Sequence, residues 1–152
     1  MVPLAPKFDH LGKHMKARVK WVENVQFEGQ SGSGHTVMMD GAPELGGRNL
    51  GCRPMELLLL GLGGCTAFDV VSILTKSREA IQGCEVEIDA ERAASDPKVF
   101  TRIHTRFIVR GKNLSAEKVK RAIDLSAEKY CSASIMLGKT AQITHDFEIH
   151  EE

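Results

Sequence analysis

The chain has no excess of charge of either sign. Its 152 residues hold 20 Lys and Arg against 20 Asp and Glu, so the formal net charge at pH 7 is zero. A nucleic-acid-binding domain carries a clustered basic surface, and an anionic membrane attracts the same kind of patch. We therefore expect small molecules or other proteins as partners, and neither nucleic acid nor a membrane.

The sequence also lacks a long hydrophobic run. The longest uncharged apolar stretch, Leu57 to Phe68, has 12 residues, whereas a helix that spans a bilayer needs roughly 20. The N-terminus shows no apolar core followed by a cleavage site, which a secretory signal would have. These absences predict a soluble cytoplasmic protein whose four cysteines stay reduced.

Metal and cofactor motifs are absent as well. The chain has no Cys-x-x-Cys and no His-x-x-x-His, and Cys52 and Cys84 have no partner at metal-ligand spacing. The glycines at 61, 63 and 64 lie inside a leucine-rich helix pattern and do not follow a strand, unlike those of a phosphate-binding loop. We expect neither a metal nor a cofactor.

The hydrophobic pattern predicts an α+β domain over residues 15–152, preceded by a flexible extension over residues 1–14. Alternation of apolar and polar residues predicts strands, a 3.6-residue period predicts helices, and Ser115 is a typical N-cap. The predicted elements are two or three antiparallel strands within 16–40, a loop over 41–53, a helix over 54–80, strands over 84–92 and 101–109, a helix over 116–130, a helical piece from Cys131 to before Gly138, and a strand over 142–149.

The helix predicted over 54–80 has apolar residues on every face as far as Ser72. A helix of this kind must be buried on every face, which a chain of this size can hardly provide alone. We therefore expect a homodimer whose core contains this helix. Its glycines cost about 1 kcal/mol each relative to alanine, a cost that close approach of another backbone would explain.

Two cysteines in helical segments are the strongest candidates for chemistry. Cys65 and Cys131 suggest redox chemistry, with burial as two small apolar side chains as the alternative. Cys131 opens a helical piece, where free N–H groups lower a thiol pKa. Cys65 lies inside its helix and needs an arginine from elsewhere; the candidates are Arg48, Arg53 and Arg18.

Two carboxylates bear on the Cys65 thiol. Asp69 lies at i+4 on the same helix face, where its charge would raise the thiol pKa. Glu56 stands out on a helix otherwise lined with leucine. Either it complements the helix dipole from the first turn, or an arginine holds it.

Three segments resemble the OsmC-like family, which includes the organic hydroperoxide resistance proteins: Pro54-Met55-Glu56-Leu57, Gly63-Gly64-Cys65, and Ala127 to Ser134 around Cys131. The stretch Lys16 to Glu23, together with Asp69 to Leu74, looks like the YhfA-like branch of that family. The resemblance implies an OsmC-like fold with antiparallel sheets around a long buried central helix. It also implies an intertwined homodimer with active sites at the subunit interface.

The same resemblance implies a peroxidase. The cysteine matching Cys65 would attack the peroxide, the one matching Cys131 would resolve it, and Glu56 would orient the activating arginine. The substrate would be an organic hydroperoxide, and the reductant a dithiol of the dihydrolipoamide type. The alternative is a non-catalytic, stress-related dimer that binds a small apolar ligand in the same cleft.

Overall fold

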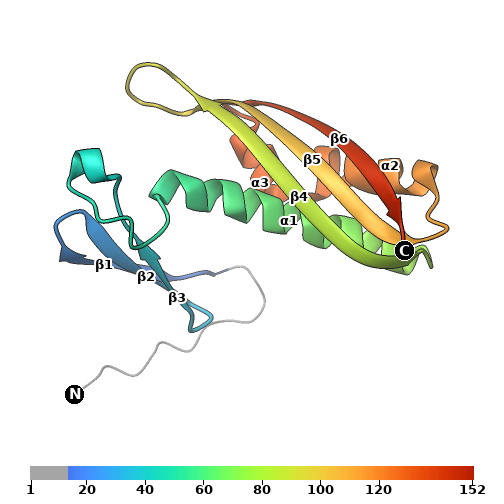
Figure 1. Cartoon of the computed structure of the whole chain (residues 1–152), viewed down its shortest axis with the longest axis horizontal. Helices are drawn as coiled ribbons and strands as arrows, with labels where there is room; N and C mark the ends of the chain where they lie inside the picture. The colour runs from blue at the N-terminus through green and yellow to red at the C-terminus, as the bar shows by residue number, and fades with distance from the viewer. Residues whose placement is uncertain (1–13) are drawn as a thin grey trace. The chain divides into compact units, whose positions relative to one another are not determined.

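The computed structural model describes residues 14–152. The extension predicted over residues 1–14 therefore lies, apart from His14, outside the described residues. The chain divides into two compact units, Met1–Leu58 and Leu59–Glu152, and each contains a three-stranded sheet (Figure 1). That residues 15–152 form one domain stays a prediction.

The first unit contains an antiparallel meander within the region where strands are predicted. Strands β1 (Ala17–Glu23), β2 (Gln26–Ser31) and β3 (Thr36–Met39) pair in that order. The β1–β2 turn is tight because Asn24 adopts the left-handed conformation (φ 47°). The indole Nε1–H of Trp21 donates to the Asn24 carbonyl over 2.8 Å. A short 3₁₀ helix, η1 (Pro43–Leu45), follows in the predicted loop.

This sheet lacks a hydrophobic core of its own. None of the chain's buried hydrophobic residues comes from the described residues 14–58, and every residue of β1 is exposed. Val19 and Trp21 keep 62% and 63% of their surface in contact with solvent. A small sheet needs an apolar face packed against something to be stable, so this one requires cover.

The long helix α1 (Pro54–Lys76) begins at the predicted residue and ends four residues before the predicted one. Pro54 takes the first helical position, which suits its fixed φ and missing N–H. The helix stops because Arg78 adopts the left-handed conformation (φ 59°). α1 is 23 residues long, with a mean hydropathy of 2.0 over its most apolar window, so by length and composition it could cross a membrane. The uncharged 12-residue run of the sequence is therefore part of a longer helix, which extends beyond that run on both sides.

The second unit is built on a mixed sheet. Strands β4 (Ala80–Arg92) and β5 (Phe100–Lys112) pair antiparallel, and β6 (Gln142–Glu151) pairs parallel to β5. The β5–β6 pair differs from the all-antiparallel expectation because three helical segments separate these strands and carry the chain back across the sheet. The α+β class is confirmed.

The crossover consists of α2 (Ala116–Leu125), a π-helical turn η2 (Ser126–Tyr130) and α3 (Ser132–Leu137). Ser115 caps α2 as predicted, since its side chain accepts the Lys118 N–H at 3.3 Å. The chain is helical over the predicted range 116–130, with α-helical turns to Leu125 and a π turn over the last five residues. Leu137 ends the last piece before Gly138, as expected.

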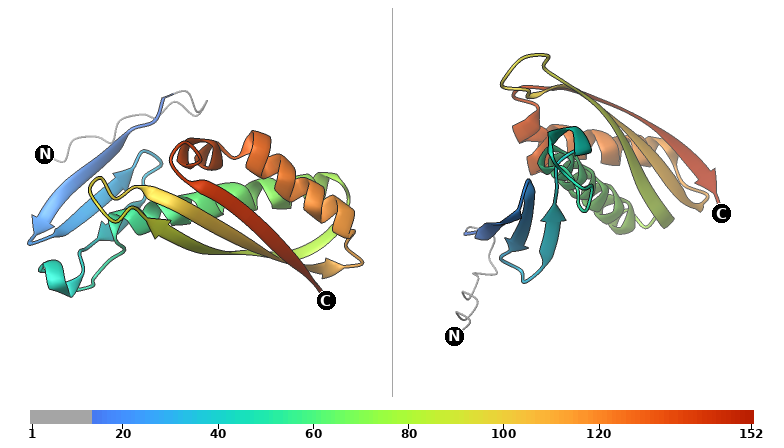
Figure 2. Two further views of the ribbon diagram at one scale, coloured as in Figure 1. Left: turned by 90° about the horizontal axis from the view of Figure 1, so that it is seen from above. Right: turned by 60° about the vertical axis from the view of Figure 1, so that its left-hand side comes forward.

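The core of this unit lies where α1 and α2 cover one face of the sheet (Figure 2). α1 buries a single stripe at i, i+4 spacing, formed by Leu62, Thr66, Val70 and Leu74. The buried cluster joins both helices to β5: Val70, Leu74, Phe107, Val109, Val119, Ala122 and Ile123. The opposite face of the sheet is charged, as the alternation in β4 and β5 predicted. Cross-strand ion pairs join Arg102 to Glu91 (3.4 Å) and Arg110 to Glu85 (3.3 Å).

Glu79 fastens the start of α2 to the segment that follows α1. Its carboxylate accepts the Ser115 N–H (2.8 Å) and pairs with the Lys118 ammonium (2.8 Å). The hydrogen bond from Lys118, followed by that from Ser115, lowers the pKa of Glu79 below its ordinary value of 4.5.

This lowered pKa predicts an acid-dependent loss of stability. Glu79 binds a proton more readily in the unfolded chain, so its contribution is complete above pH 4.5 and is lost as the pH falls below that value. We expect Glu79→Gln to lower the urea midpoint at pH 7, and the deficit to shrink towards pH 3. Glu44→Gln, in exposed η1, serves as the control. A deficit that is constant from pH 7 to pH 3 would contradict this role for the charge.

Candidate active site

The structure brings the two predicted redox cysteines together. Cys65 lies in the middle of α1, and Cys131 lies at the junction of η2 and α3. The two thiols are neighbours, since Cys65 is among the groups that raise the pKa of Cys131. All four cysteines are free thiols, so the structure represents the reduced form.

The two thiols differ in burial. Cys131 has no exposed surface, whereas Cys65 is half-buried. As predicted, Cys131 opens a helical piece: it caps α3, and its Sγ accepts the Ser134 N–H at 3.4 Å. Burial nevertheless raises the pKa of Cys131 above its ordinary value of 9.0, and the neighbouring Cys65 raises it further. The hydrogen bonds from Ser134 oppose this shift.

A buried chain of hydroxyls lies beside the thiols. Ser126 Oγ lies 2.8 Å from Thr66 Oγ1 and donates to Asp69 Oδ2 at 2.9 Å. The sequence pattern indicated Asp69 as a charge opposing Cys65, but the structure binds its carboxylate to Ser126. Reasoning from the sequence missed Thr66 and Ser126, because nothing in the pattern signals a contact across 60 residues.

The remaining predicted site residues belong to the first unit. Glu56 is exposed in the first turn of α1, where its carboxylate accepts the backbone N–H of Arg53 at 3.2 Å. Of the two roles expected for Glu56, this geometry is the one in the first turn of the helix: the carboxylate binds the main chain and not a guanidinium. The Arg53 guanidinium donates to Asn49 Oδ1 (2.8 Å) and to the Gly51 carbonyl (3.3 Å). Arg48 pairs with Glu23.

Asp40 organises the loop that carries these arginines, a role that the sequence analysis missed. Its side chain is buried, with 2% exposed, and accepts the backbone N–H groups of Gly41 (2.8 Å), Arg48 (3.2 Å) and Leu50 (3.1 Å). These bonds, that of Leu50 foremost, lower the pKa of Asp40. A short acidic side chain before a glycine-rich loop was the available signal.

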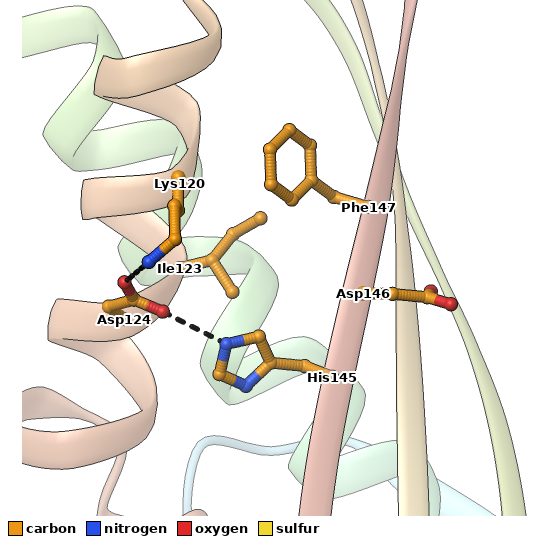
Figure 3. Close-up of a pocket in the computed structure, with 6 residues that line it drawn as sticks. All are labelled: Lys120, Ile123, Asp124, His145, Asp146 and Phe147. Carbon is orange, nitrogen blue, oxygen red and sulfur yellow. Dashed lines mark hydrogen bonds and ion pairs between the residues drawn. The ribbon is translucent and has the colours of Figure 1, made fainter.

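A second cluster lies between α2 and β6 (Figure 3). A cavity of about 270 Å³ is lined there by Lys120, Ile123, Asp124, His145, Asp146 and Phe147. Asp124 accepts from Lys120 (2.6 Å) and lies 3.0 Å from His145 Nε2. Lys120 lowers the pKa of Asp124, and His145 acts in the same direction. Neither redox cysteine lines this cavity. Within residues 14–152, no group of three or more His, Cys, Asp or Glu side chains has the geometry of a metal site.

Comparison with known proteins confirms the family resemblance. The sequence model of the OsmC-like protein family matches residues 46–146. Protein YhfA of Escherichia coli is 49% identical over 138 residues, which cover 89% of this chain and 98% of YhfA.

Two solved structures show the same fold at low identity. An OsmC-like protein from Mycoplasma pneumoniae is 16% identical, with a TM-score of 0.78 over 91% of this chain and 99% of the other. An organic hydroperoxide resistance protein OsmC from Legionella pneumophila is 13% identical, with a TM-score of 0.67 over 89% of this chain and 96% of the other.

The raised pKa of Cys131 predicts slow labelling in the native state. We expect iodoacetamide to modify Cys131 at pH 7.5 far more slowly in the folded protein than in urea, because only the thiolate reacts and burial disfavours it. Cys84, whose pKa burial also raises, should behave likewise. Peptide mass spectrometry after timed labelling gives both rates, with half-buried Cys52 as the internal reference. Equal rates for Cys131 in folded and unfolded protein would contradict the assignment.

Proposed function

Because the chain belongs to the OsmC-like protein family, we propose that it is a thiol-dependent peroxidase that reduces organic hydroperoxides. The observation that carries the proposal is the pair of neighbouring free thiols, one half-buried and one fully buried. Proteins of the same fold include those described as organic hydroperoxide resistance proteins, which suggests a stress-related role. Family membership also identifies α1 as the central helix of this fold and not as a membrane span.

The proposed cycle has three balanced steps. The Cys65 thiolate attacks the O–O bond, which releases an alcohol and leaves a sulfenic acid on Cys65. The Cys131 thiol then attacks that sulfur, forming the disulfide and releasing water. An external dithiol, of the dihydrolipoamide type, reduces the disulfide by thiol–disulfide exchange and leaves as its own disulfide.

Burial supports this division of roles between the two cysteines. A nucleophile must be a thiolate and must meet its substrate, and a buried thiol with a raised pKa satisfies neither condition. Cys65 is half-buried, and Phe68, one helical turn away, is 72% exposed. An apolar surface of this kind beside the nucleophile favours an organic hydroperoxide over hydrogen peroxide.

In this cycle a cation activates Cys65, with Arg48 and Arg53 as candidates. Glu56 accepts the backbone N–H of Arg53, so it would orient that arginine through the main chain. The backbone N–H of Arg48 is bound by the Asp40 carboxylate, and that of Arg53 by the Glu56 carboxylate. One observation favours the non-catalytic alternative. Each guanidinium already has an acceptor, Glu23 for Arg48 and Asn49 for Arg53. A dimer that binds a small apolar ligand remains the second candidate.

The catalytic cycle predicts different outcomes for the two cysteine variants. Cys65→Ser should abolish consumption of cumene hydroperoxide in the presence of excess dihydrolipoamide. Cys131→Ser should still reduce one equivalent per chain, because the sulfenic acid forms and only its capture is lost. Cys52→Ser is the matched control and should keep wild-type turnover. Wild-type protein that consumes no hydroperoxide with either dihydrolipoamide or dithiothreitol would leave the ligand-binding dimer as the better proposal.

We further propose that the protein is an intertwined homodimer in the cytoplasm. Only 22% of the most apolar window of α1 is buried within one chain, and Phe68 and Val71 are exposed. Gly61 and Gly64 leave open space where a Cβ would lie, which suits close approach of a second backbone. The four free thiols fit a reducing compartment.

Light scattering coupled to size-exclusion chromatography tests the dimer. We expect twice the chain mass at micromolar concentration, because the exposed apolar face of α1 is too large to leave in water. Phe68→Lys should weaken the dimer by placing a charge in that face, whereas Lys139→Ala, on the exposed segment after α3, should leave the mass unchanged. A stable wild-type monomer would overturn the proposal.

A further inference from the structure

We propose that Thr66, Ser126 and Asp69 are positioning residues that hold the Cys65 and Cys131 thiols at the separation needed for rapid disulfide formation. The inference deepens the proposed function and rests on its resolving step. It follows from the direction of the hydrogen bonds in this chain of side chains, from their burial, and from the place of the π turn between Ser126 and Cys131.

The three side chains form a directed chain of hydrogen bonds. A hydroxyl carries one hydrogen, and that of Ser126 is given to the Asp69 carboxylate, which can only accept. Thr66 must therefore donate to Ser126 Oγ. The Thr66 hydroxyl donates to the Ser126 hydroxyl, which donates to the Asp69 carboxylate. The second hydrogen bond has a charged acceptor and is therefore stronger than a bond between neutral groups.

The chain of hydrogen bonds connects the two segments that carry the redox cysteines: its two ends lie on α1 with Cys65, and its middle member is bound to Cys131. Thr66 directly follows Cys65 on α1, and Asp69 lies one turn further along the same helix. Ser126 opens the π turn, and its carbonyl accepts the Cys131 N–H at 2.8 Å. The hydroxyl of Ser126 is thus bound to side chains of α1, the helix that carries Cys65, and its carbonyl is bound to the N–H of Cys131.

The π turn sets where Cys131 points. The π turn closes with the Cys131 N–H on the Ser126 carbonyl, and Cys131 itself is extended (φ −77°, ψ 102°), so the helix stops at this residue. An α-helix running on through residue 131 would carry its side chain to a different face.

Because Ser126 is fully buried and Thr66 is 3% exposed, water does not replace their mutual hydrogen bond if one partner is removed.

The equilibrium with glutathione measures this positioning directly. Reduced protein and oxidised glutathione exchange to give the Cys65–Cys131 disulfide and two reduced glutathiones, and the equilibrium constant is the effective concentration of one thiol towards the other. Acid quenching, alkylation and peptide mass spectrometry give the fraction of the linked pair. We expect Ser126→Ala and Asp69→Ala to lower this constant by about tenfold or more.

Two further variants separate positioning from general destabilisation. Asp69→Asn keeps an oxygen that can accept from Ser126 and should retain a constant close to that of the wild type. Val109→Ala removes buried volume from β5, an element that carries no member of the hydroxyl chain, and should lower the melting temperature while leaving the constant unchanged. Melting temperatures of all variants are measured alongside.

The same variants give a kinetic readout with hydroperoxide. In Ser126→Ala the alcohol should be released at the wild-type rate, while the Cys65 sulfenic acid persists long enough to be trapped by dimedone. Unchanged glutathione constants in Ser126→Ala and Asp69→Ala, or an equal fall in Val109→Ala, would overturn the inference. The glutathione equilibrium needs no peroxide. A wild-type protein that has a high equilibrium constant for the Cys65–Cys131 disulfide, lowered in Ser126→Ala, but that consumes no hydroperoxide would therefore refute the proposed function and leave the positioning role standing.

Discussion

The structure depends above all on apolar surface that one chain leaves uncovered. The sheet of the first unit contributes no buried hydrophobic residue among residues 14–58, and α1 buries one stripe of four residues within its own chain. The free energy that holds a small domain together comes mainly from apolar burial. Neither the meander nor the far side of α1 gains that energy alone. These two surfaces are therefore the ones that the proposed homodimer would cover.

The second unit, by contrast, has a complete core, and its polar exceptions are concentrated beside the two thiols. Thr66 interrupts the apolar stripe of α1, and Ser126 is fully buried at the end of α2. A buried hydroxyl costs stability unless it is bound, and these two are bound to each other and to Asp69. The buried hydroxyls of this core thus lie beside the π turn that ends at Cys131.

Sequence reasoning recovered what depends on local pattern. The alternation in β4 and β5, the cap at Ser115 and the stop before Gly138 all appear in the structure as expected. It did not find the π turn, because residues 116–130 keep a helical pattern and an extra residue in one turn leaves that pattern intact. Contacts between distant residues were also beyond reach. The bond from Ser126 to Asp69 and the pairing of His145 with Asp124 depend on how helices and strands pack, which no spacing in the sequence encodes.

The burial of Cys131 illustrates a balance between reactivity and protection. A thiol with a raised pKa is a poor nucleophile in solution, and one with no exposed surface cannot meet a hydroperoxide, so Cys131 is shielded from direct oxidation. The same properties would make it a slow resolving group if it had to find its partner by diffusion. Placing it against Cys65 removes that requirement, because a held neighbour reacts as though present at very high concentration. In the proposed cycle the rate of disulfide formation would therefore depend on geometry more than on acidity, which is why the proposed positioning by the hydroxyl chain would matter for the resolving step.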